Sequence, residues 1–460
     1  MAPPTPSAPV GSIGVALLGL GVVGRGVFEA LRDNAAIYAT RSGRPIAVRG
    51  VAVHDLTRAR DGVDQALLTN DPRALAVRDD IDIVVELMGG MEPAAACIEA
   101  ALAAGKSVVT ANKEVMAKRG PELLALAQQN GVALLYEASV GGGIPIIAPL
   151  NRDLQANEIR SLQAIINGTT NFMLTAMAQD GLSYDAALAE AQRRGYAEAD
   201  PSSDVGGVDA AYKLAILASL AFHTTVHPDD VYREGITQLS ARDFRFAADL
   251  GYVIRLLAVA QRDTDGALDV RVHPTLLDAH DPLARVDGVL NAVAVEGDLL
   301  GRAIFEGEGA GSRPTTSAVV ADLLHLVSSG PASRGPASRG AASNHPPESP
   351  PRQPPTDPPP AQFASRGALH MRYYLRVLVR DRPGVIAEIG RAFATNNISI
   401  ASLLQVEADA VAGTAELIIT THHARESDID RFMATAGMLD AVQDVGIRIR
   451  IGSASAGSRP

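Results

Sequence analysis

Short apolar runs alternate with longer amphipathic stretches over the first 150 residues of the chain. The apolar runs predict strands at 12–18, Ile46–Val53, Ile83–Leu87, Ser107–Thr110 and Ala133–Tyr136. The stretches between them predict helices, notably Pro93–Ala104 and Gly120–Asn130. Strands that alternate with helices form a parallel sheet with helices on both faces. Residues 11–150 are therefore predicted to be an α/β domain with a doubly wound sheet.

The pattern changes after residue 151, where short strands mix with long helical stretches. Strands are predicted at Ile159–Ile166, Leu268–Pro274, Asn291–Glu296 and Ala303–Glu306. Helical spacing covers 171–222 and 245–257, so residues 151–313 read as an α+β domain. A helix over 314–327 is expected to return and complete the first domain.

The remaining chain separates into a linker and a third domain. The unit Gly-Pro-Ala-Ser-Arg occurs twice, at 330–334 and 335–339, and many prolines follow. Such a composition predicts that 328–367 is a disordered or extended linker. Residues 370–451 show the order β-α-β-β-α-β of a ferredoxin-like fold. Because a linker precedes it, this domain is expected to be a separate unit with few contacts to the rest.

Composition and charge narrow the class of protein. The hydrophobic content of 47% is that of a globular protein, and no apolar run approaches the ~18 residues that cross a membrane. The net charge of −11 argues against a nucleic-acid partner. Cys97 is the one cysteine, so no internal disulfide is possible, and core filling is its expected role. We expect a cytoplasmic protein with no membrane or nucleic-acid partner.

A glycine motif, Gly19-Leu20-Gly21-Val22-Val23-Gly24, follows the first predicted strand and opens a helix. In that context it predicts a Rossmann-type dinucleotide site, although a glycine-rich turn without ligand is the alternative. The acid that binds the ribose is expected about 20 residues on, and Asp55 is the best candidate although it comes later. Arg58 and Arg60 follow it and could hold a 2′-phosphate, so NAD and NADP both remain possible.

The stretch from Gly195 to Lys213 concentrates polar chemistry. The chain has 41 Lys and Arg residues, but its lysines are only Lys106, Lys113, Lys118 and Lys213. A lysine kept against such a bias is a candidate for proton transfer, which arginine cannot perform.

Lys213 stands four residues after Asp209, the spacing of one helix face, and the carboxylates Glu198 and Asp204 lie just upstream. An Asp–Lys pair at this spacing is often only a solvated helix face. Here, however, an almost wholly apolar helix follows, which favours a buried site for an amine-bearing substrate.

With these pieces placed, the chain resembles the homoserine dehydrogenase family, in its bacterial monofunctional form with a C-terminal ACT domain. The resemblance covers nearly everything except the N-terminal tail and the linker. It rests on the glycine motif extended to Gly26, Thr110-Ala-Asn-Lys113, Glu137-Ala-Ser-Val-Gly-Gly-Gly-Ile-Pro-Ile, Ile166-Asn-Gly-Thr-Thr-Asn171-Phe, Gly195-Tyr-Ala-Glu-Ala-Asp-Pro, Asp209-Ala-Ala-x-Lys213 and Gly309-Ala-Gly-x-x-Pro-Thr-x-Ser-Ala318.

The resemblance implies interconversion of L-aspartate 4-semialdehyde and L-homoserine with NAD or NADP. Lys213 would protonate the carbonyl oxygen as hydride arrives, and Asp209 would hold that ammonium group. Glu198 would bind the α-ammonium group of the substrate, and Asp204 its polar end. Lys113 would contact nicotinamide or substrate.

The resemblance also implies a monovalent cation, Na⁺ being the favoured ion, and a segment that closes over the nicotinamide. The cation would bind main-chain carbonyls, a donor set that suits a hard ion. The residues concerned are Glu137, Val140, Gly142 and Ile144 for the cation and Gly309 and Gly311 for the closing segment.

The third domain resembles ACT domains, which bind amino acids at interfaces between copies. This implies feedback by an amino acid, threonine being the favoured effector, at Asp381–Gly384 and Asn396–Ile398 of a homodimer or homotetramer. The pathway implied is the synthesis of threonine, methionine and isoleucine. Another amino-acid or aldehyde dehydrogenase, or an amino-acid sensor with a degenerate catalytic part, remain the rival hypotheses.

One departure from the family pattern bears on the coenzyme. Many relatives have Arg-Asp at the end of the second strand, where this chain has His54-Asp55. That difference removes the arginine through which NADP preference would otherwise be argued.

Overall fold

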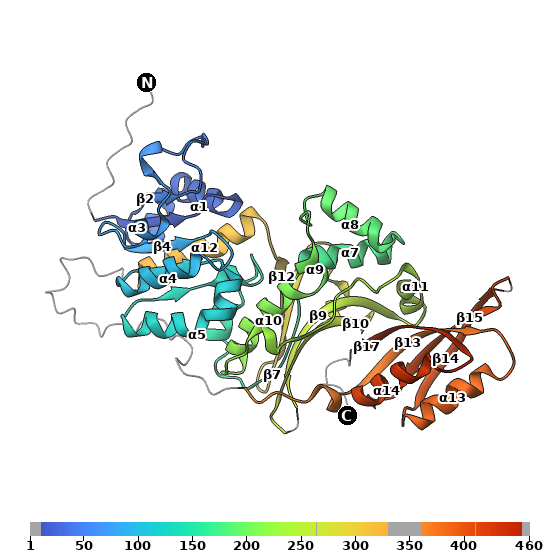
Figure 1. Cartoon of the computed structure of the whole chain (residues 1–460). Helices are drawn as coiled ribbons and strands as arrows, with labels where there is room; N and C mark the ends of the chain where they lie inside the picture. The colour runs from blue at the N-terminus through green and yellow to red at the C-terminus, as the bar shows by residue number, and fades with distance from the viewer. Residues whose placement is uncertain (1–10, 264, 330–360, 410, 453–460) are drawn as a thin grey trace. The chain divides into compact units, whose positions relative to one another are not determined.

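The computed structural model describes residues 11–263, 265–329, 361–409 and 411–452 (Figure 1). The chain divides into two compact units, each built from three stretches of sequence. The first unit comprises Met1–Ile159, Tyr212–Asp230 and Glu296–Pro360. The second unit comprises Arg160–Ala211, Val231–Val295 and Ala361–Pro460.

A parallel sheet forms the centre of the first unit, with the strand order β3-β2-β1-β4-β5-β6. The strands are β1 Ile13–Leu18, β2 Ile46–Ala52, β3 Leu68–Thr69, β4 Ile83–Glu86, β5 Ser107–Thr110 and β6 Leu134–Leu135. The predicted Rossmann-type doubly wound sheet is thereby confirmed. Every residue of β1 and β4 is buried, which explains why these strands read as continuous apolar runs.

Helices cover this sheet: α1 Val22–Asp33, α2 Ala35–Ser42, α3 Pro72–Ala76, α4 Ala94–Ala103, α5 Lys113–Gln129 and α12 Ser312–Ser329. The short helix α6 Ile147–Asn151 belongs to the same unit. Helix α5 begins seven residues before its predicted start, because the Asn112 side chain accepts a hydrogen bond from the Val115 amide (3.1 Å) and caps the helix there. Helix α12 is the segment expected at 314–327, and its Val319 and Leu323 lie in the core with Leu17 of β1. Cys97 of α4 is fully buried in the same unit.

The second unit is built on a mixed sheet, whose strands run in the order β11-β7-β9-β10-β17-β13-β15-β14. The stretch before the third domain contributes β7 Ile159–Ile165, β8 Tyr232–Arg233, β9 Tyr252–Arg262, β10 Leu268–Asp278 and β11 Leu290–Gly297. Strand β12 Gly301–Glu308 belongs to the first unit. The helices of the second unit are α7 Gly168–Gln179, α8 Tyr184–Arg193, α9 Ser202–Val205 and α11 Ala241–Asp249. Helix α10 Val208–Ala221 begins in this unit and continues into the first unit from Tyr212.

The helix predicted over 245–257 is wrong in its second half. Helix α11 ends at Asp249, Gly251 adopts a positive φ of 79°, and β9 begins at Tyr252. The run that follows is buried on both faces of a central strand, and such a run has no period that distinguishes strand from helix.

The third domain has the predicted β-α-β-β-α-β order, with one short extra strand. Its elements are β13 His370–Arg380, α13 Val385–Thr395, β14 Ile400–Asp409, β15 Thr414–Thr421, β16 Ala424–Arg425, α14 Glu426–Ala436 and β17 Val442–Ile451. Phe393 and Phe432 of the two helices meet with ring centroids 4.2 Å apart over the buried side chains of the sheet. The ferredoxin-like prediction is confirmed.

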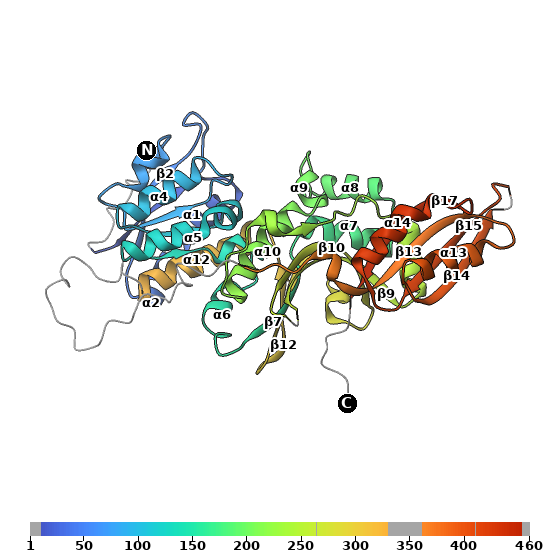
Figure 2. The same ribbon diagram turned by 60° about the horizontal axis from the view of Figure 1, so that its bottom comes forward.

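The third domain is not a separate unit, and the expectation of few contacts with the rest is wrong. Strand β17 pairs in parallel with β10, Thr275 opposite Arg450, so the two domains share one sheet (Figure 2). The linker predicted at 328–367 lies partly outside the described residues, at 330–360. Its described end is ordered, because the Leu268 amide donates to the Gln362 carbonyl (2.7 Å). Within the described ranges no helix is long and apolar enough to span a membrane.

Candidate active site

The glycine loop after β1 has the geometry of a dinucleotide site. Gly19 has a φ of 107°, and a Cβ there would lie 2.7 Å from the Leu87 carbonyl oxygen. A Cβ on Gly24 would lie 2.2 Å from the Gly19 oxygen, so α1 packs against the loop with no room for a side chain at this position. A Cβ on Gly21 would meet nothing within 4 Å. Gly21 precedes α1 without a side-chain cap, which leaves main-chain N–H groups for phosphates.

The predicted ribose acid lies at the end of β2, the strand beside β1. Asp55 is exposed, and its Oδ1 accepts hydrogen bonds from the Thr57 hydroxyl (2.6 Å) and amide (2.8 Å). These bonds lower the pKa of the Asp55 carboxyl, so it is ionised at neutral pH. Arg58 is also exposed, and its carbonyl accepts a hydrogen bond from Arg60 (2.8 Å). Acid and arginines therefore share one loop, as the sequence indicated.

A cavity of about 330 Å³ opens in the first unit beside the glycine loop. It brings together five of the predicted site residues: Val23, Lys113, Gly142, Lys213 and Gly309. Its remaining wall is formed by Leu87, Met88, Gly89, Gly90, Ala111, Asn112, Glu114, Ala138, Ser139, Gly141, Ala310 and Thr315. Two of the four lysines of the chain thus face one cavity, whose wall is otherwise mostly small and apolar.

Each lysine is placed by the helix that carries it. Lys113 is the first residue of α5, directly after the Asn112 cap. Lys213 lies on the second turn of α10 and is only 9% exposed, and Asp209 stands one turn before it and is 3% exposed. A helix this apolar is buried on most sides, so it carries the Asp–Lys pair out of solvent. The solvated helix face considered above does not describe these two residues.

Two glycine-rich loops meet at the wall of the same cavity. A Cβ on Gly142 would lie 2.4 Å from the Gly309 carbonyl oxygen, and the Gly143 amide donates to the Glu308 carbonyl (3.0 Å). Gly311 has a φ of 119°, a conformation that favours glycine. The segment that the resemblance assigned to the nicotinamide is therefore held against the loop assigned to the cation.

Two predicted site carboxylates, Asp204 for the substrate and Asp209 for Lys213, meet through an asparagine in the second unit. The Asn167 amide donates to Asp204 (2.7 Å) and to Asp209 (2.9 Å), while its oxygen accepts from the Thr170 amide (2.8 Å) and caps α7. Asn167 is 4% exposed. Sequence reasoning assigned it no role, although its position before Gly-Thr-Thr is a recognisable helix cap.

Glu198 lies apart from this hydrogen-bonded cluster. Its side chain is exposed on the loop between α8 and α9, and its carbonyl accepts from the Gln192 side chain (3.1 Å). An exposed carboxylate on a loop is free to meet the ammonium group of an incoming ligand.

The buried carboxyl of Glu86 supports the loops that form the cavity wall, and sequence reasoning did not identify it. It is fully buried at the end of β4, where it accepts from the Thr110 hydroxyl (2.6 Å) and the Met88 amide (2.7 Å). Burial raises the pKa of the Glu86 carboxyl, although these hydrogen bonds act to lower it. The Asn112 amide donates in turn to the Thr110 hydroxyl (3.0 Å), and its side chain donates to the Gly90 carbonyl (2.7 Å). One network thus joins the loops after β4 and β5.

In the Glu137–Ile144 loop, the Glu137 side chain is hydrogen-bonded to main-chain amides. The carboxylate of Glu137 accepts from the amides of Ile146 (2.6 Å), Ile147 (2.8 Å) and Ala148 (2.7 Å), so it faces the start of α6. Its amide donates to Asp322 (2.9 Å), and burial raises the pKa of that carboxyl to about 8.

Main-chain carbonyls remain as donors for a cation in this loop. Gly141 and Gly142 have positive φ angles of 73° and 54°, which let successive carbonyls turn, and Val140 and Ile144 are buried. Among the described residues no group of three His, Cys, Asp or Glu side chains could hold a metal ion. Main-chain carbonyl oxygens are thus the donors that this loop could offer to a hard cation.

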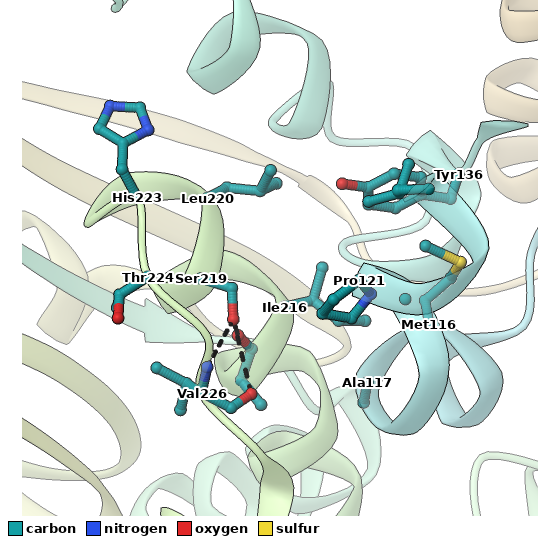
Figure 3. A pocket seen from close by; sticks show the side chains of 13 residues that line it. Met116, Ala117, Pro121, Tyr136, Ile216, Ser219, Leu220, His223, Thr224 and Val226 are labelled. Atoms are coloured by element: carbon teal, nitrogen blue, oxygen red, sulfur yellow. Dashed lines mark hydrogen bonds between the residues drawn. The ribbon is translucent and has the colours of Figure 1, made fainter. Parts of the chain in front are cut away.

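A smaller cavity, of about 50 Å³, lies between α5 and α10 at the far end of α10 from Lys213 (Figure 3). The Ser219 hydroxyl donates to the Ala215 carbonyl (2.8 Å) and accepts from the Val226 amide (3.0 Å). His223 has a φ of 52°, and the Thr224 amide returns to the Ser219 carbonyl (3.2 Å). His223 thus adopts a left-handed conformation just after the end of the helix.

Three family models match the chain in order. They are the homoserine dehydrogenase NAD-binding domain at residues 19–137, homoserine dehydrogenase at 145–324 and the ACT domain at 373–435. Homoserine dehydrogenase of Corynebacterium glutamicum is 44% identical over 447 residues, covering 96% of each chain. The chain belongs to the homoserine dehydrogenase family.

Solved structures of the family agree with this assignment. A homoserine dehydrogenase from Thiobacillus denitrificans superposes with a TM-score of 0.86 at 42% identity, covering 96% of this chain and 98% of that one. A hyperthermophilic archaeal homoserine dehydrogenase in complex with NADPH has a TM-score of 0.58 at 28% identity, covering 68% and 97%. The protein is an NAD(P)-dependent oxidoreductase that acts on a CH–OH group, and its ACT domain indicates binding of an amino-acid effector.

Proposed function

We propose that this family member interconverts L-aspartate 4-semialdehyde and L-homoserine, with Lys213 as the proton donor and acceptor. The observation that carries this is the burial of Lys213 in the wall of the cavity beside the glycine loop. The bound coenzyme supplies or removes the hydride at the reacting carbon. Lys213 gives its proton to the carbonyl oxygen in reduction and takes the hydroxyl proton in oxidation.

The carboxylates of the second unit suit the rest of the substrate. Asp209, on the same helix, holds the Lys213 ammonium by charge. Asp204 binds the polar end of the substrate, and Glu198 pairs with its α-ammonium group. Asn167 supports this proposal, because it donates to Asp204 and Asp209 and so fixes both carboxylates.

The coenzyme is proposed to bind with its pyrophosphate at the start of α1 and its nicotinamide near Lys113, Gly309 and Gly311. Asp55 would accept from the ribose hydroxyls of NAD, and Arg58 would hold the 2′-phosphate of NADP. Both stand exposed on one loop, so the preference is a matter for measurement. Steady-state kinetics with NADH and NADPH decide it.

A monovalent cation, with Na⁺ favoured, is proposed to bind the carbonyls of Glu137, Val140, Gly142 and Ile144. The ion would add charge and rigidity to the loop that meets Gly309. Activity in a tetramethylammonium buffer should then fall and be restored by added Na⁺. Full activity without any alkali cation would remove the cation from the proposal.

Regulation and pathway complete the proposal. Threonine would bind at Asp381–Gly384 and Asn396–Ile398 of paired copies in a homodimer or homotetramer, and the enzyme would serve synthesis of threonine, methionine and isoleucine. Gly384 (φ 93°) and Asn397 (φ 59°) support an effector site, because left-handed turns expose main-chain N–H groups.

The decisive experiment follows NAD(P)H absorbance with L-aspartate 4-semialdehyde and with shorter and longer semialdehydes. Preference for the first by at least tenfold in kcat/KM is expected. Preference for another aldehyde would identify a different dehydrogenase, and absence of turnover with all of them would favour an amino-acid sensor. The same assay with added L-threonine tests the feedback.

A further inference from the structure

A buried ionic network ties the last ACT strand to the segment that follows β8. Arg450 of β17 is fully buried and donates twice to Glu234, at 2.9 and 3.1 Å. Arg448 donates to the same carboxylate at 2.8 Å. Arg450 also pairs with the fully buried Glu426, which accepts from the Tyr373 hydroxyl (2.7 Å). Glu234 is therefore the carboxylate that joins the segment after β8 to strand β17.

The charge on Glu234 is well defined. Burial opposes its ionisation, but the hydrogen bonds and positive charge of Arg450 lower its pKa to about 2. The carboxylate is thus ionised at every pH at which the enzyme would be assayed. The Glu234 side chain is 26% exposed and Arg450 is fully buried, so loss of the Glu234 charge would leave the desolvated Arg450 with one carboxylate partner fewer, which is costly.

The residues directly after Glu234 support the junction between α9 and α10. A Cβ on Gly235 would lie 2.2 Å from the Val205 oxygen and 2.9 Å from the Gly206 Cα. The Ile236 amide donates to the same Val205 oxygen (2.9 Å), and Ile236 is fully buried. Val205 is the last residue of α9 and follows Asp204 directly.

The other side of this junction rests on β10 and again on Glu234. Gly207 has a φ of 78°, and a Cβ there would lie 3.2 Å from Val272 and 3.7 Å from the Glu234 oxygen. The Glu234 amide donates to the Val272 carbonyl (2.8 Å). Gly207 stands two residues before Asp209, so Asp204 and Asp209 flank a junction with almost no free space.

The connecting segment, residues 232–243, is fastened to the ACT domain at its other end too. Asp243 is fully buried and accepts from Arg376 of β13 (2.8 Å), while Ser240 and Asp243 form a capping box at the start of α11. Arg242 pairs with Glu416 of β15 (2.8 Å). The segment is thus held by ACT strands at both ends and by the α9–α10 junction between them.

We propose that Glu234 is a positioning residue for substrate binding, which couples the ACT strand β17 to Asp204 through Gly235 and the end of α9. This inference rests on the proposed role of Asp204 in substrate binding. A displacement of β17 moves Glu234, shifts Gly235 against Val205 and so displaces the Asp204 carboxylate, which directly precedes Val205 in the chain. By reciprocity, substrate bound at Asp204 biases the ACT domain in return.

The test compares Glu234→Gln with the unchanged full-length enzyme. The expected result is a rise of about tenfold in KM for homoserine, equivalent to about 1.4 kcal/mol, with kcat and the coenzyme KM within twofold. Amides of residues 200–211 should also exchange hydrogen faster. Asp287→Asn is the matched control, because it removes a carboxylate that pairs with the buried Arg255 (2.5 Å) in the same unit, and it should leave the KM for homoserine unchanged.

The double variant with Asp204→Asn separates this inference from the proposed function. If Glu234 acts through Asp204, the double variant should have the KM of Asp204→Asn alone; multiplied effects would overturn the coupling. An unchanged KM in Asp204→Asn would instead refute the role of that carboxylate in the proposed function. If Glu234→Gln does not fold, Glu234→Asp keeps the charge and should give a smaller rise in KM. An Asp variant with unchanged KM and unchanged exchange would refute the inference.

Discussion

Two alanine substitutions in the glycine loop should separate folding from coenzyme binding. A methyl group on Gly24 would lie 2.2 Å from the Gly19 oxygen, about 1 Å inside normal contact, and that oxygen is main chain and cannot rotate away. Overpacking of this kind costs about 1–3 kcal/mol. The better helix propensity of alanine offsets up to about 1 kcal/mol of it. A contact this short belongs at the upper end of the overpacking range, so after the offset Gly24→Ala should lose about 2 kcal/mol of stability, and coenzyme affinity with it.

Gly21→Ala should behave in the opposite way. Its φ of −75° suits alanine, and its methyl group would meet nothing within 4 Å, so stability should stay within about 0.5 kcal/mol. The methyl group would stand where the pyrophosphate approaches α1, and the Kd for NADPH should rise at least tenfold, about 1.4 kcal/mol. Thermal unfolding and fluorescence titration measure the two effects. A Gly21→Ala enzyme with normal NADPH affinity, or a Gly24→Ala enzyme of normal stability, would refute this assignment of the loop.

Four further predictions follow from the site and the fold. Lys213→Ala should lower kcat by about 10²–10⁴-fold, and Lys213→Arg should do almost the same, because a guanidinium keeps its proton. Near-normal turnover of the arginine variant would exclude proton transfer by this lysine. Glu198→Gln should raise the KM for homoserine by about 10–100-fold, the value of a charge-assisted hydrogen bond, and an unchanged KM would place Glu198 outside the site. Burial raises the pKa of Cys97 to about 11, so a thiol reagent at pH 8 should label the native protein far more slowly than the unfolded chain. Fast labelling of the native protein would contradict that burial. A chain that ends at Ser328 should be much less stable in thermal unfolding, because β10 loses its partner strand β17; a truncated enzyme as stable as the full chain would contradict the shared sheet.

Local patterns predicted those elements whose residues interact with near neighbours in sequence. The glycine motif and the apolar strands of the first unit act within a few residues, so the Rossmann-type sheet could be read directly. The run Tyr252–Leu257 could not, because a strand buried on both faces and a buried helix show the same continuous apolar sequence. Only Gly251, with its φ of 79°, marked the boundary, and a single glycine is also tolerated within a helix.

The site residues also fall into those that local sequence patterns reveal and those that they do not. Lys213 could be found because lysine is so rare in this chain, and Asp209 because it lies one helical turn away. Asn167 could not be assigned a role, since the carboxylates it joins lie 37 and 42 positions further along the chain. Asp322, which accepts from the Glu137 amide, lies 185 positions from it. Nothing local in a sequence tells which distant polar groups share one buried network.

The ACT domain shows why modularity in sequence is a poor guide to independence in space. Arg448 and Arg450 alternate on the last strand, a pattern typical of a solvent-exposed face, and a proline-rich linker precedes the domain. In the structure Arg450 is fully buried, because Glu234 and Glu426 neutralise it from two domains. Buried charges with partners from both sides leave neither half complete alone. Strand β17 is therefore part of the framework of the second unit, because it pairs with β10 and contacts Glu234, whose neighbour Ile236 is hydrogen-bonded to Val205 at the end of α9.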